Sequence, residues 1–296
     1  MHLILKKMVF MWMVLLEAGG HSKEILKLLD GGTLVCIDRD IEAINKAKDV
    51  LKDYEKNNEV ILVQENHENI PEILNILGIN KVDGILLDLG VSSYQIDNGE
   101  RGFSYMHNGK LDMRMDNTTG ITACDIINEY SLEELIRIFK EYGEEKFASK
   151  IAKEIIIQRG KKKIETTFEL NQIIEKAKPY TKKGHKSKQV FQALRIEVNK
   201  EIVNLENSVK NMIDVLKNEG RIAIITFHSL EDKAIKKVFK EKEGKCTCPK
   251  DLPVCVCGYK SFGKNLTKKA IIPNKEEVLE NTRSKSAKLR VFERVE

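Results

Sequence analysis

Short apolar runs and longer amphipathic segments alternate along the chain from about residue 19. The apolar runs at 33–37, 60–63 and 82–87 have the length and composition of buried strands. The segments at 41–56 and 71–77 have the apolar spacing of helices. Strands that alternate with helices in this order predict an α/β fold with a parallel, doubly wound sheet.

The pattern changes after Asp116, where only helical spacing is found from about 122 to 178. Ser131-Leu-Glu-Glu forms a capping box, and Thr167 begins a further helix. A helix over about 190–217 follows, and strand character returns at Arg221. The helical block therefore looks like an insertion into the sheet domain. The expected parts are 1–104 as the first part of the core, 105–189 as the helical insertion, and 190–296 as the second part of the core.

Composition narrows the class of protein only modestly. The chain has 296 residues, of which 42% are hydrophobic and 32% charged, as in a globular protein rather than a disordered one. Its net charge of +5 is too small to indicate nucleic acid by itself. The apolar run Met8–Leu16 imitates a secretory signal but is too short to span a membrane, so we expect a cytoplasmic protein.

Four of the six cysteines fall in one short loop, at 246–257. This distribution indicates a reducing compartment rather than a disulfide scaffold. Four thiols so close together could bind a structural zinc ion tetrahedrally, although paired C-x-C differs from the usual C-x-x-C. Free loop thiols are the alternative, and a catalytic role is not expected. The candidate ligands are Cys246, Cys248, Cys255 and Cys257.

A glycine pair and an aspartate have the spacing of a nucleoside-binding site. Gly19 and Gly20 precede a helix, where glycine lets a ligand approach the backbone, and His21 follows them. Asp38 ends the next strand, where a carboxylate can accept both hydroxyls of a ribose. A complete G-x-G-x-x-G is absent, which argues against a nicotinamide dehydrogenase.

Polar residues also follow the strand at 82–87. Asp88, Ser92, Ser93 and Gln95 come at its carboxyl end, which is where open α/β sheets bind their ligands. His228 occupies the same kind of position after the strand that begins at Arg221. It could accept a proton, contact RNA, or be a structural histidine with satisfied hydrogen bonds.

Nine ordered segments resemble those of the bacterial small-subunit ribosomal RNA cytosine-N4 methyltransferases, the methyltransferase H family. The resemblance covers nearly everything after Glu17 and is carried by long motifs. These are Gly19-Gly-His-Ser, Ile37-Asp-Arg-Asp, Asp83-Gly-Ile-Leu-Leu-Asp-Leu-Gly-Val-Ser-Ser, Glu100-Arg-Gly-Phe-Ser, Leu111-Asp-Met-Arg-Met-Asp, Tyr142-Gly-Glu-Glu, Phe191-Gln-Ala-Leu-Arg-Ile, Phe227-His-Ser-Leu-Glu-Asp and Arg283-Ser-Lys-Ser-Ala-Lys-Leu-Arg.

The resemblance implies an enzyme that uses S-adenosyl-L-methionine to methylate the N4 amine of a cytosine in 16S rRNA. It implies a Rossmann-like methyltransferase core with an inserted helical domain. Gly19, Gly20 and His21 would line the methionine side of the cofactor, Asp38 its ribose and His67 its adenine, with Asp88 and Gln95 completing the pocket. At His67 the family often has an aromatic residue, and an exposed loop histidine is the alternative.

The implied chemistry suits these residue types. The lone pair of a cytosine amine is delocalised into the ring, so the site must hold the amine in line with the methyl group and accept its protons. Asp88 with Ser92 and Ser93 could do both, and His228 is a further candidate acceptor.

The target base must also leave its stack, with Tyr94, Phe103 and Tyr105 as candidate stacking partners. Loop packing is the alternative for each aromatic. Basic residues on or near the insertion would contact rRNA phosphates: Lys161 to Lys163, Lys182, Lys183, Lys186, Lys188 and Arg195. The alternation of Asp112, Arg114 and Asp116 with apolar residues fits either a half-buried strand or hinge, or a turn beside the active site.

The beginning of the chain departs from the family. Met8–Glu17 stands where the family has a strand followed by an acidic residue and a turn glycine. Met11-Trp-Met-Val can be encoded only as ATG TGG ATG GTN, which reads Val-Asp-Gly from its third nucleotide. We therefore hypothesise that residues 1 to about 17 are a frame-shifted translation or a misassigned start, which gene sequencing would decide. If this start abolishes cofactor binding, a non-catalytic rRNA-binding or ribosome assembly protein is the alternative function.

Overall fold

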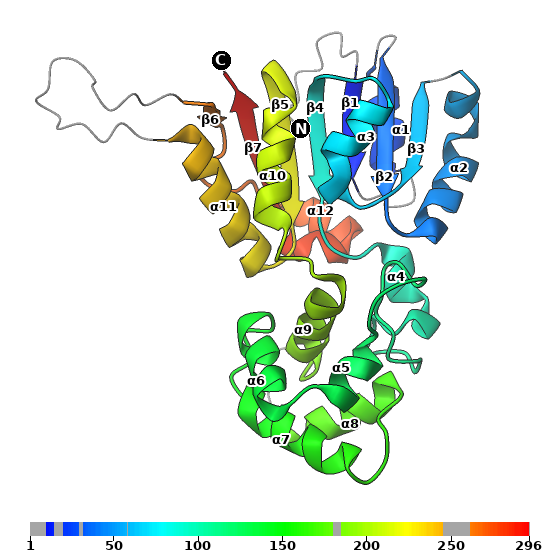
Figure 1. Cartoon of the computed structure of the whole chain (residues 1–296), viewed down its shortest axis with the longest axis vertical. Helices are drawn as coiled ribbons and strands as arrows, with labels where there is room; N and C mark the ends of the chain where they lie inside the picture. The colour runs from blue at the N-terminus through cyan, green and yellow to red at the C-terminus, as the bar shows by residue number, and fades with distance from the viewer. Residues whose placement is uncertain are drawn as a thin grey trace, which may run out of the picture. The chain divides into compact units, whose positions relative to one another are not determined.

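The chain folds into two compact units, a sheet unit formed by Met1–Gly90 with Ile202–Glu296 and a helical unit formed by Val91–Glu201 (Figure 1). A computed structural model provides the coordinates. It describes residues 10–14, 20–29, 32–57, 59–179, 185–244 and 261–295. In this part of the chain, no helix is long and apolar enough to cross a membrane.

The sheet unit contains a seven-stranded sheet in the order β3-β2-β1-β4-β5-β7-β6. Strands β1 to β5 are parallel to one another, whereas β7 runs antiparallel to both β5 and β6. The predicted parallel, doubly wound sheet is thus confirmed, and two antiparallel strands that were not predicted extend it. The strands are β1 Phe10–Val14, β2 Thr33–Asp38, β3 Val60–Gln64, β4 Val82–Asp88, β5 Leu216–Thr226, β6 Gly263–Asn265 and β7 Lys288–Arg294.

Helices cover both faces of this sheet, because successive side chains of each strand point to opposite faces. Leu34 and Cys36 of β2 belong to one core cluster with residues of α1 and α2. Val35 and Ile37 belong to the other, with residues of α3, α10 and α11. The helices of this unit are α1 Gly20–Leu26, α2 Ile41–Lys56, η1 His67–Asn69, α3 Ile70–Ile76, α10 Leu205–Asp214, α11 Ser229–Glu243, α12 Lys275–Glu280 and η3 Thr282–Ser286.

A strand occupies the centre of the sheet despite the unusual beginning of the sequence. Trp12 of β1 pairs with Val35 of β2 on one side and with Ile85 of β4 on the other. The altered start therefore still supplies a central strand. The frame-shift hypothesis concerns the gene and stays a prediction.

The helical unit has one apolar core, to which all of its longer helices contribute. The predicted capping box at Ser131 is confirmed, and Thr166, one residue before the predicted start, caps the helix that begins at Thr167. Its helices are α4 Ser93–Asp97, η2 Gly99–Arg101, α5 Ala123–Glu129, α6 Leu132–Glu141, α7 Ala148–Arg159, α8 Thr167–Ala177 and α9 Lys188–Asn199.

The boundaries of the helical unit differ from those predicted. The unit begins after Gly90 rather than at 105 and ends at Glu201 rather than at 189. Phe103 packs against the helical core and Phe191 of α9 is buried in it, and both lie outside the predicted limits, which explains the wider unit. The single helix predicted over 190–217 is wrong, because Lys200 adopts a left-handed conformation (φ 51°) that ends α9 before α10 begins.

Candidate active site

Two aspartates flank the end of the central strand. Val14 of β1 pairs with Ile37 on one side and Leu87 on the other, and the next residues of those strands are Asp38 and Asp88. The chain order of the strands reverses here, because β2 and β3 lie on one side of β1 while β4 and β5 lie on the other. Ligands of open α/β sheets bind at such a switch point, beyond the carboxyl ends of the strands.

Asp88 is a buried residue with one unsatisfied carboxylate oxygen. The residue is 5% exposed, and its Oδ2 lies 3.6 Å from Nε2 of His21. Within the described part of the chain, its Oδ1 has no hydrogen-bond partner. A buried polar atom without a partner costs about 1–3 kcal/mol, so a protein retains one mainly where function requires it.

Asp38 and Gly20 have the local geometry that cofactor binding requires. Asp38 is 3% exposed, and its Oδ1 accepts the backbone NH of Asp40 at 2.8 Å, which fixes the carboxylate at the end of β2. Asp40 in turn caps α2. Among the described residues, leaving aside its chain neighbours and the backbone of its own helix, no atom lies within 4 Å of the position that a Cβ on Gly20 would take, so these residues leave space beside this backbone. Gly19 lies outside the described residues.

His67 is half-buried in η1, at the turn after β3. The alternative of an exposed loop histidine is therefore wrong. Burial, with a smaller contribution from the positive charge of Arg39, lowers the pKa of His67 to about 4. Its Nδ1 has no hydrogen-bond partner among the described residues. At neutral pH the ring is therefore uncharged.

Ser92 and Gln95 form a capping box at the start of α4, in the helical unit. The Ser92 Oγ accepts the NH of Gln95 at 3.2 Å, and the Gln95 Oε1 accepts the NH of Ser92 at 3.0 Å. The spacing S-x-x-Q is the known signature of this cap, whereas both residues are predicted above only as site residues. Their contacts with amine or cofactor stay predictions. The side chain of Ser93 lies outside the described residues.

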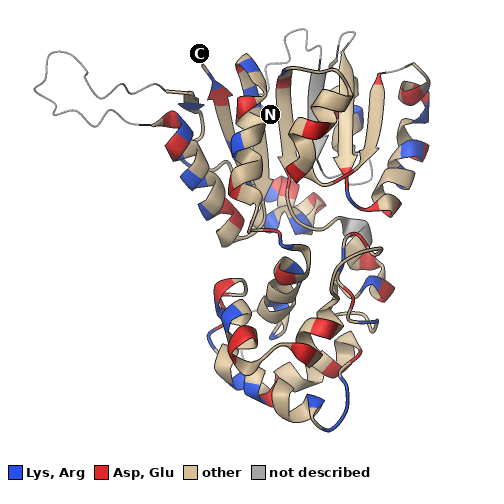
Figure 2. Ribbon diagram, viewed as in Figure 1, with Lys and Arg blue, Asp and Glu red and all other residues tan. Residues whose placement is uncertain are grey.

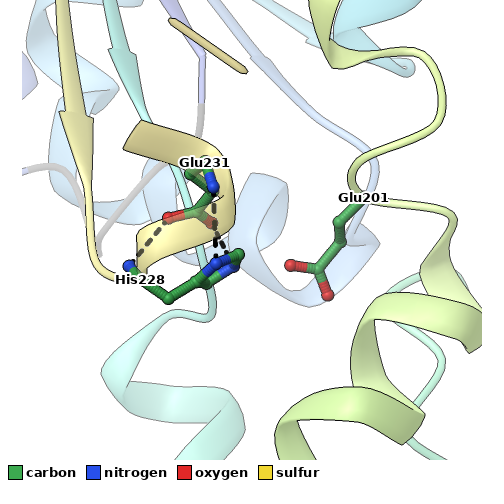
Figure 3. A group of neighbouring side chains, drawn as sticks. All are labelled: Glu201, His228 and Glu231. Carbon is green, nitrogen blue, oxygen red and sulfur yellow. Dashed lines mark hydrogen bonds and ion pairs between the residues drawn. The ribbon is translucent and has the colours of Figure 1, made fainter. Parts of the chain in front are cut away.

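His228 caps helix α11, as Figure 3 shows for its contacts with Glu231. Its Nδ1 accepts the backbone NH of Glu231 at 3.5 Å, and its Nε2 lies 2.9 Å from the Glu231 carboxylate. The Nδ1 of His228 is thus used in the cap, whereas its Nε2, although close to the carboxylate, makes no hydrogen bond with any described residue. The cap supports a structural role for His228, and its roles as proton acceptor and RNA contact stay predictions.

Several of the predicted RNA-contacting cations are engaged within the helical unit. Arg195 donates two hydrogen bonds of 2.9 Å to Glu201, and Lys162 pairs with Glu169 at 2.6 Å. Lys186 donates to two backbone carbonyls. Figure 2 shows basic and acidic positions interspersed along these helices. The basic surface is therefore weaker than the sequence predicts, and Lys182 and Lys183 lie outside the described residues.

The candidate stacking aromatics also have packing roles. Tyr105 stacks on His185 with ring centres 4.3 Å apart and meets Phe191 edge-on. Phe103 lies beside the guanidinium of Arg101, at 5.8 Å. For these two, loop packing is the better interpretation, whereas the side chain of Tyr94 lies outside the described residues.

Two further predictions concern loops. Asp112 and Arg114 form an ion pair of 2.8 Å in an irregular segment in which Met113 has a left-handed φ of 61°, so a regular strand is wrong there. The four cysteines proposed as zinc ligands lie outside the described residues, and the zinc site stays a prediction.

Comparison with known proteins assigns the family. The model of the MraW methylase family matches residues 4–295, which extends upstream of the resemblance recognised after Glu17. The chain is 53% identical over 284 residues to a protein of Lachnospira eligens, covering 95% of this chain and 90% of that protein. It is 51% identical over 280 residues to one of Finegoldia magna, covering 93% and 89%.

A third relative, from Caldicellulosiruptor saccharolyticus, is 52% identical over 279 residues, covering 94% of this chain and 90% of that protein. All three relatives are named ribosomal RNA small subunit methyltransferase H. Because the family model spans nearly the whole sequence, the chain belongs to the MraW methylase family.

Proposed function

We propose that this protein is an S-adenosyl-L-methionine-dependent methyltransferase that acts on the N4 amine of a cytosine in 16S rRNA. The observation that carries the proposal is the buried Asp88, which keeps one oxygen without a partner at the switch point of the sheet. Family membership supports methyl transfer, and the names of the relatives support small-subunit ribosomal RNA as the substrate. The cytosine N4 amine rests on the resemblance of the sequence motifs.

The residues at this edge fit the cofactor. The fixed Asp38 carboxylate would hold the ribose, and the open space beside Gly20 would admit the methionine portion. The neutral ring of His67 would lie against the adenine. The bound cofactor supplies an electrophilic methyl group on a sulfonium. His21 near Asp88 would border the reacting end of the pocket.

Asp88 is the proposed acceptor for the target amine. A cytosine N4 amine has two N–H donors, and the free Oδ1 can accept one of them. This hydrogen bond would orient the nitrogen toward the methyl group. The amine nitrogen would take the methyl group from the sulfonium, leaving the thioether S-adenosylhomocysteine, and would lose a proton, for which the carboxylate is the nearest base proposed. His228 is the second candidate acceptor, because its Nε2 also has no hydrogen-bond partner among the described residues, although it lies 2.9 Å from the Glu231 carboxylate.

We also propose that the helical unit contributes to rRNA binding through its exposed lysines. Lys161 and Lys163 remain exposed on the loop between α7 and α8. Contacts of this kind neutralise phosphates without reading sequence, so this part of the affinity should fall steeply with salt.

Two measurements test the proposed function. Calorimetric titration of the full chain with S-adenosyl-L-methionine should show one binding site. Mass spectrometry of nucleosides should show N4-methylcytidine in small-subunit rRNA from cells with the gene and a loss of this nucleoside from cells without it. An unchanged N4-methylcytidine signal would contradict the proposed reaction, and absence of cofactor binding would favour the non-catalytic rRNA-binding alternative.

A further inference from the structure

A hollow lies in the sheet unit, beyond the carboxyl end of β5. Its volume is about 290 Å³, and its lining comes from three stretches of the chain: Phe227 to Ser229, Ile272 and Pro273 with Val278, and Lys285 to Lys288. Figure 1 shows α12, which contains Val278, near that end of the strand. None of the residues assigned to the cofactor lines this hollow, so it is a separate feature.

The lining combines an apolar wall with a positive rim. Phe227, Ile272 and Val278 supply the wall, and Ile272 is 69% exposed. Lys285 and Lys288 supply the rim, and none of the lining residues is a carboxylate. An apolar surface beside cations suits a ligand that has a flat ring at one end and an anion at the other.

The two lysines differ in how far the protein already engages them. The ammonium of Lys288 lies 3.5 Å from Asp232, but that carboxylate also pairs with Arg290 at 2.6 Å. Lys285 is exposed and makes no ion pair with any described residue. Its charge is therefore available to a ligand.

The start of helix α11 does not supply the positive charge. The backbone NH groups of Phe227 and His228 donate to the Glu231 carboxylate, at 2.8 and 3.2 Å. These groups are thus already engaged within the protein. Attraction of an anion to the hollow therefore depends on the lysines, which makes the feature testable by single substitutions.

The hollow adjoins the proposed reaction site. A Cβ on Gly90, two residues after Asp88, would come within 3.4 Å of the Phe227 ring. Strands β4 and β5 are also neighbours, and neighbouring strands lie about 4.8 Å apart. A ligand beyond β5 therefore lies one strand away from a base held at Asp88.

We propose that this hollow binds the nucleotide next to the target cytosine in the RNA strand. Its base lies against Phe227 and Ile272, and its phosphate lies between Lys285 and Lys288. The inference rests on the proposed function, because it takes Asp88 as the position of the target amine. It adds a specificity site for the flanking nucleotide, in addition to the sequence-independent contacts of the helical unit.

The test uses the full chain and a fluorescent oligoribonucleotide of about eleven nucleotides, with one cytosine centred in a uridine tract, a length within the usual single-strand site sizes. Lys285→Ala should weaken binding about fivefold and reduce the slope of log affinity against log salt by about 0.7. Lys275→Ala, which changes an exposed lysine of α12 outside the hollow, should do neither.

A second comparison tests for the base. An abasic site on one side of the cytosine should cost wild-type binding about tenfold, within the range of base–aromatic stacking. In Ile272→Ala the same abasic site should cost clearly less, because part of the wall is already missing. All three variants should bind S-adenosyl-L-methionine as the wild type does.

Two outcomes would overturn the proposal. One is a Lys285→Ala variant that matches Lys275→Ala in affinity and salt slope, and the other is an abasic penalty that Ile272→Ala leaves unchanged on both sides of the cytosine. Wild-type methyl transfer measured on the same preparations separates this result from failure of the proposed function. Transfer without the pocket effects refutes the nucleotide site alone.

Discussion

Two buried carboxylates, one in each unit, are treated in opposite ways. Glu145 in the helical unit is 3% exposed, and both of its oxygens are used: one accepts from Lys178 at 2.6 Å and the other from the Phe147 NH at 2.8 Å. Asp88 in the sheet unit is 5% exposed, and its Oδ1 has no partner in the described structure. Glu145 is fully hydrogen-bonded within the protein, whereas Asp88 keeps one oxygen that a ligand can use.

The number of hydrogen-bond partners thus indicates which of the two buried carboxylates is functional. Lys178 also donates to the Lys186 carbonyl and to Gln189, so the Glu145 network joins α8 to the start of α9. Its motif, Tyr142-Gly-Glu-Glu, belongs to the resemblance as much as the Asp88 motif does. Resemblance alone does not separate a structural residue from a reactive one, and the unsatisfied buried oxygen is the further observation that favours Asp88.

The largest expected effect comes from changing the unsatisfied carboxylate. Asp88→Asn should lower methyl transfer about a thousandfold, because the amide cannot accept a proton, and acid–base groups contribute about 10²–10⁴-fold. The melting temperature should not fall, because no internal hydrogen bond of Oδ1 is lost. Single-turnover methylation and thermal unfolding of the same preparation measure both.

Asp83→Asn provides the matched control. Asp83 lies at the other end of the same strand and pairs with Lys217 at 2.9 Å. This variant should retain wild-type transfer. Equal loss of activity in the two variants, or loss of folding in Asp88→Asn alone, would remove the distinction between the carboxylates.

The next effect should fall on stability and leave the chemistry at Asp88 intact. Lys178→Met leaves Glu145 charged and buried, so we expect a loss of about 3 kcal/mol in the free energy of unfolding. Adding Glu145→Leu should recover much of this loss, because no buried charge then remains. Denaturant unfolding of the wild type and the two variants measures the coupling, and a single variant as stable as the wild type would show that the network contributes little.

Sequence predicted best what depends on neighbouring residues. Helix α2 has the predicted bounds because its amphipathic period and its Asp40 cap agree. Asp38 and Asp88 were found because each directly follows a buried strand. The pair Glu145–Lys178 and the hollow beyond β5 were missed, since they join residues far apart in the sequence. The break at Lys200 had no signal, because a non-glycine residue adopts the left-handed conformation there.

The stability of the fold should depend on pH through His67. Because burial lowers the pKa of His67 to about 4, the unfolded chain takes up a proton before the folded chain does. The stabilising contribution of the neutral His67 ring is fully present above pH 6.5 and is lost as the pH drops toward 4. Between pH 7 and pH 5, wild type should lose about 2 kcal/mol more than His67→Gln. Urea unfolding at the two pH values measures this, and equal losses would show that the ring is solvated.

The smallest effect separates two capping boxes of similar geometry. Ser131 caps α6 and Ser92 caps α4, each in reciprocal hydrogen bonds with the residue three positions later. Ser131→Ala should cost about 1 kcal/mol of stability and leave the rate of methyl transfer in the folded protein unchanged.

If Ser92 acts only as a cap, Ser92→Ala should behave in the same way. If it also assists Asp88 with the amine, the transfer rate at saturating cofactor should fall by more than the stability loss explains, and restoring the hydroxyl with Ser92→Thr should recover it. Measuring the transfer rate and the stability of both alanine variants therefore decides whether Ser92 takes part in the reaction or acts only as a helix cap.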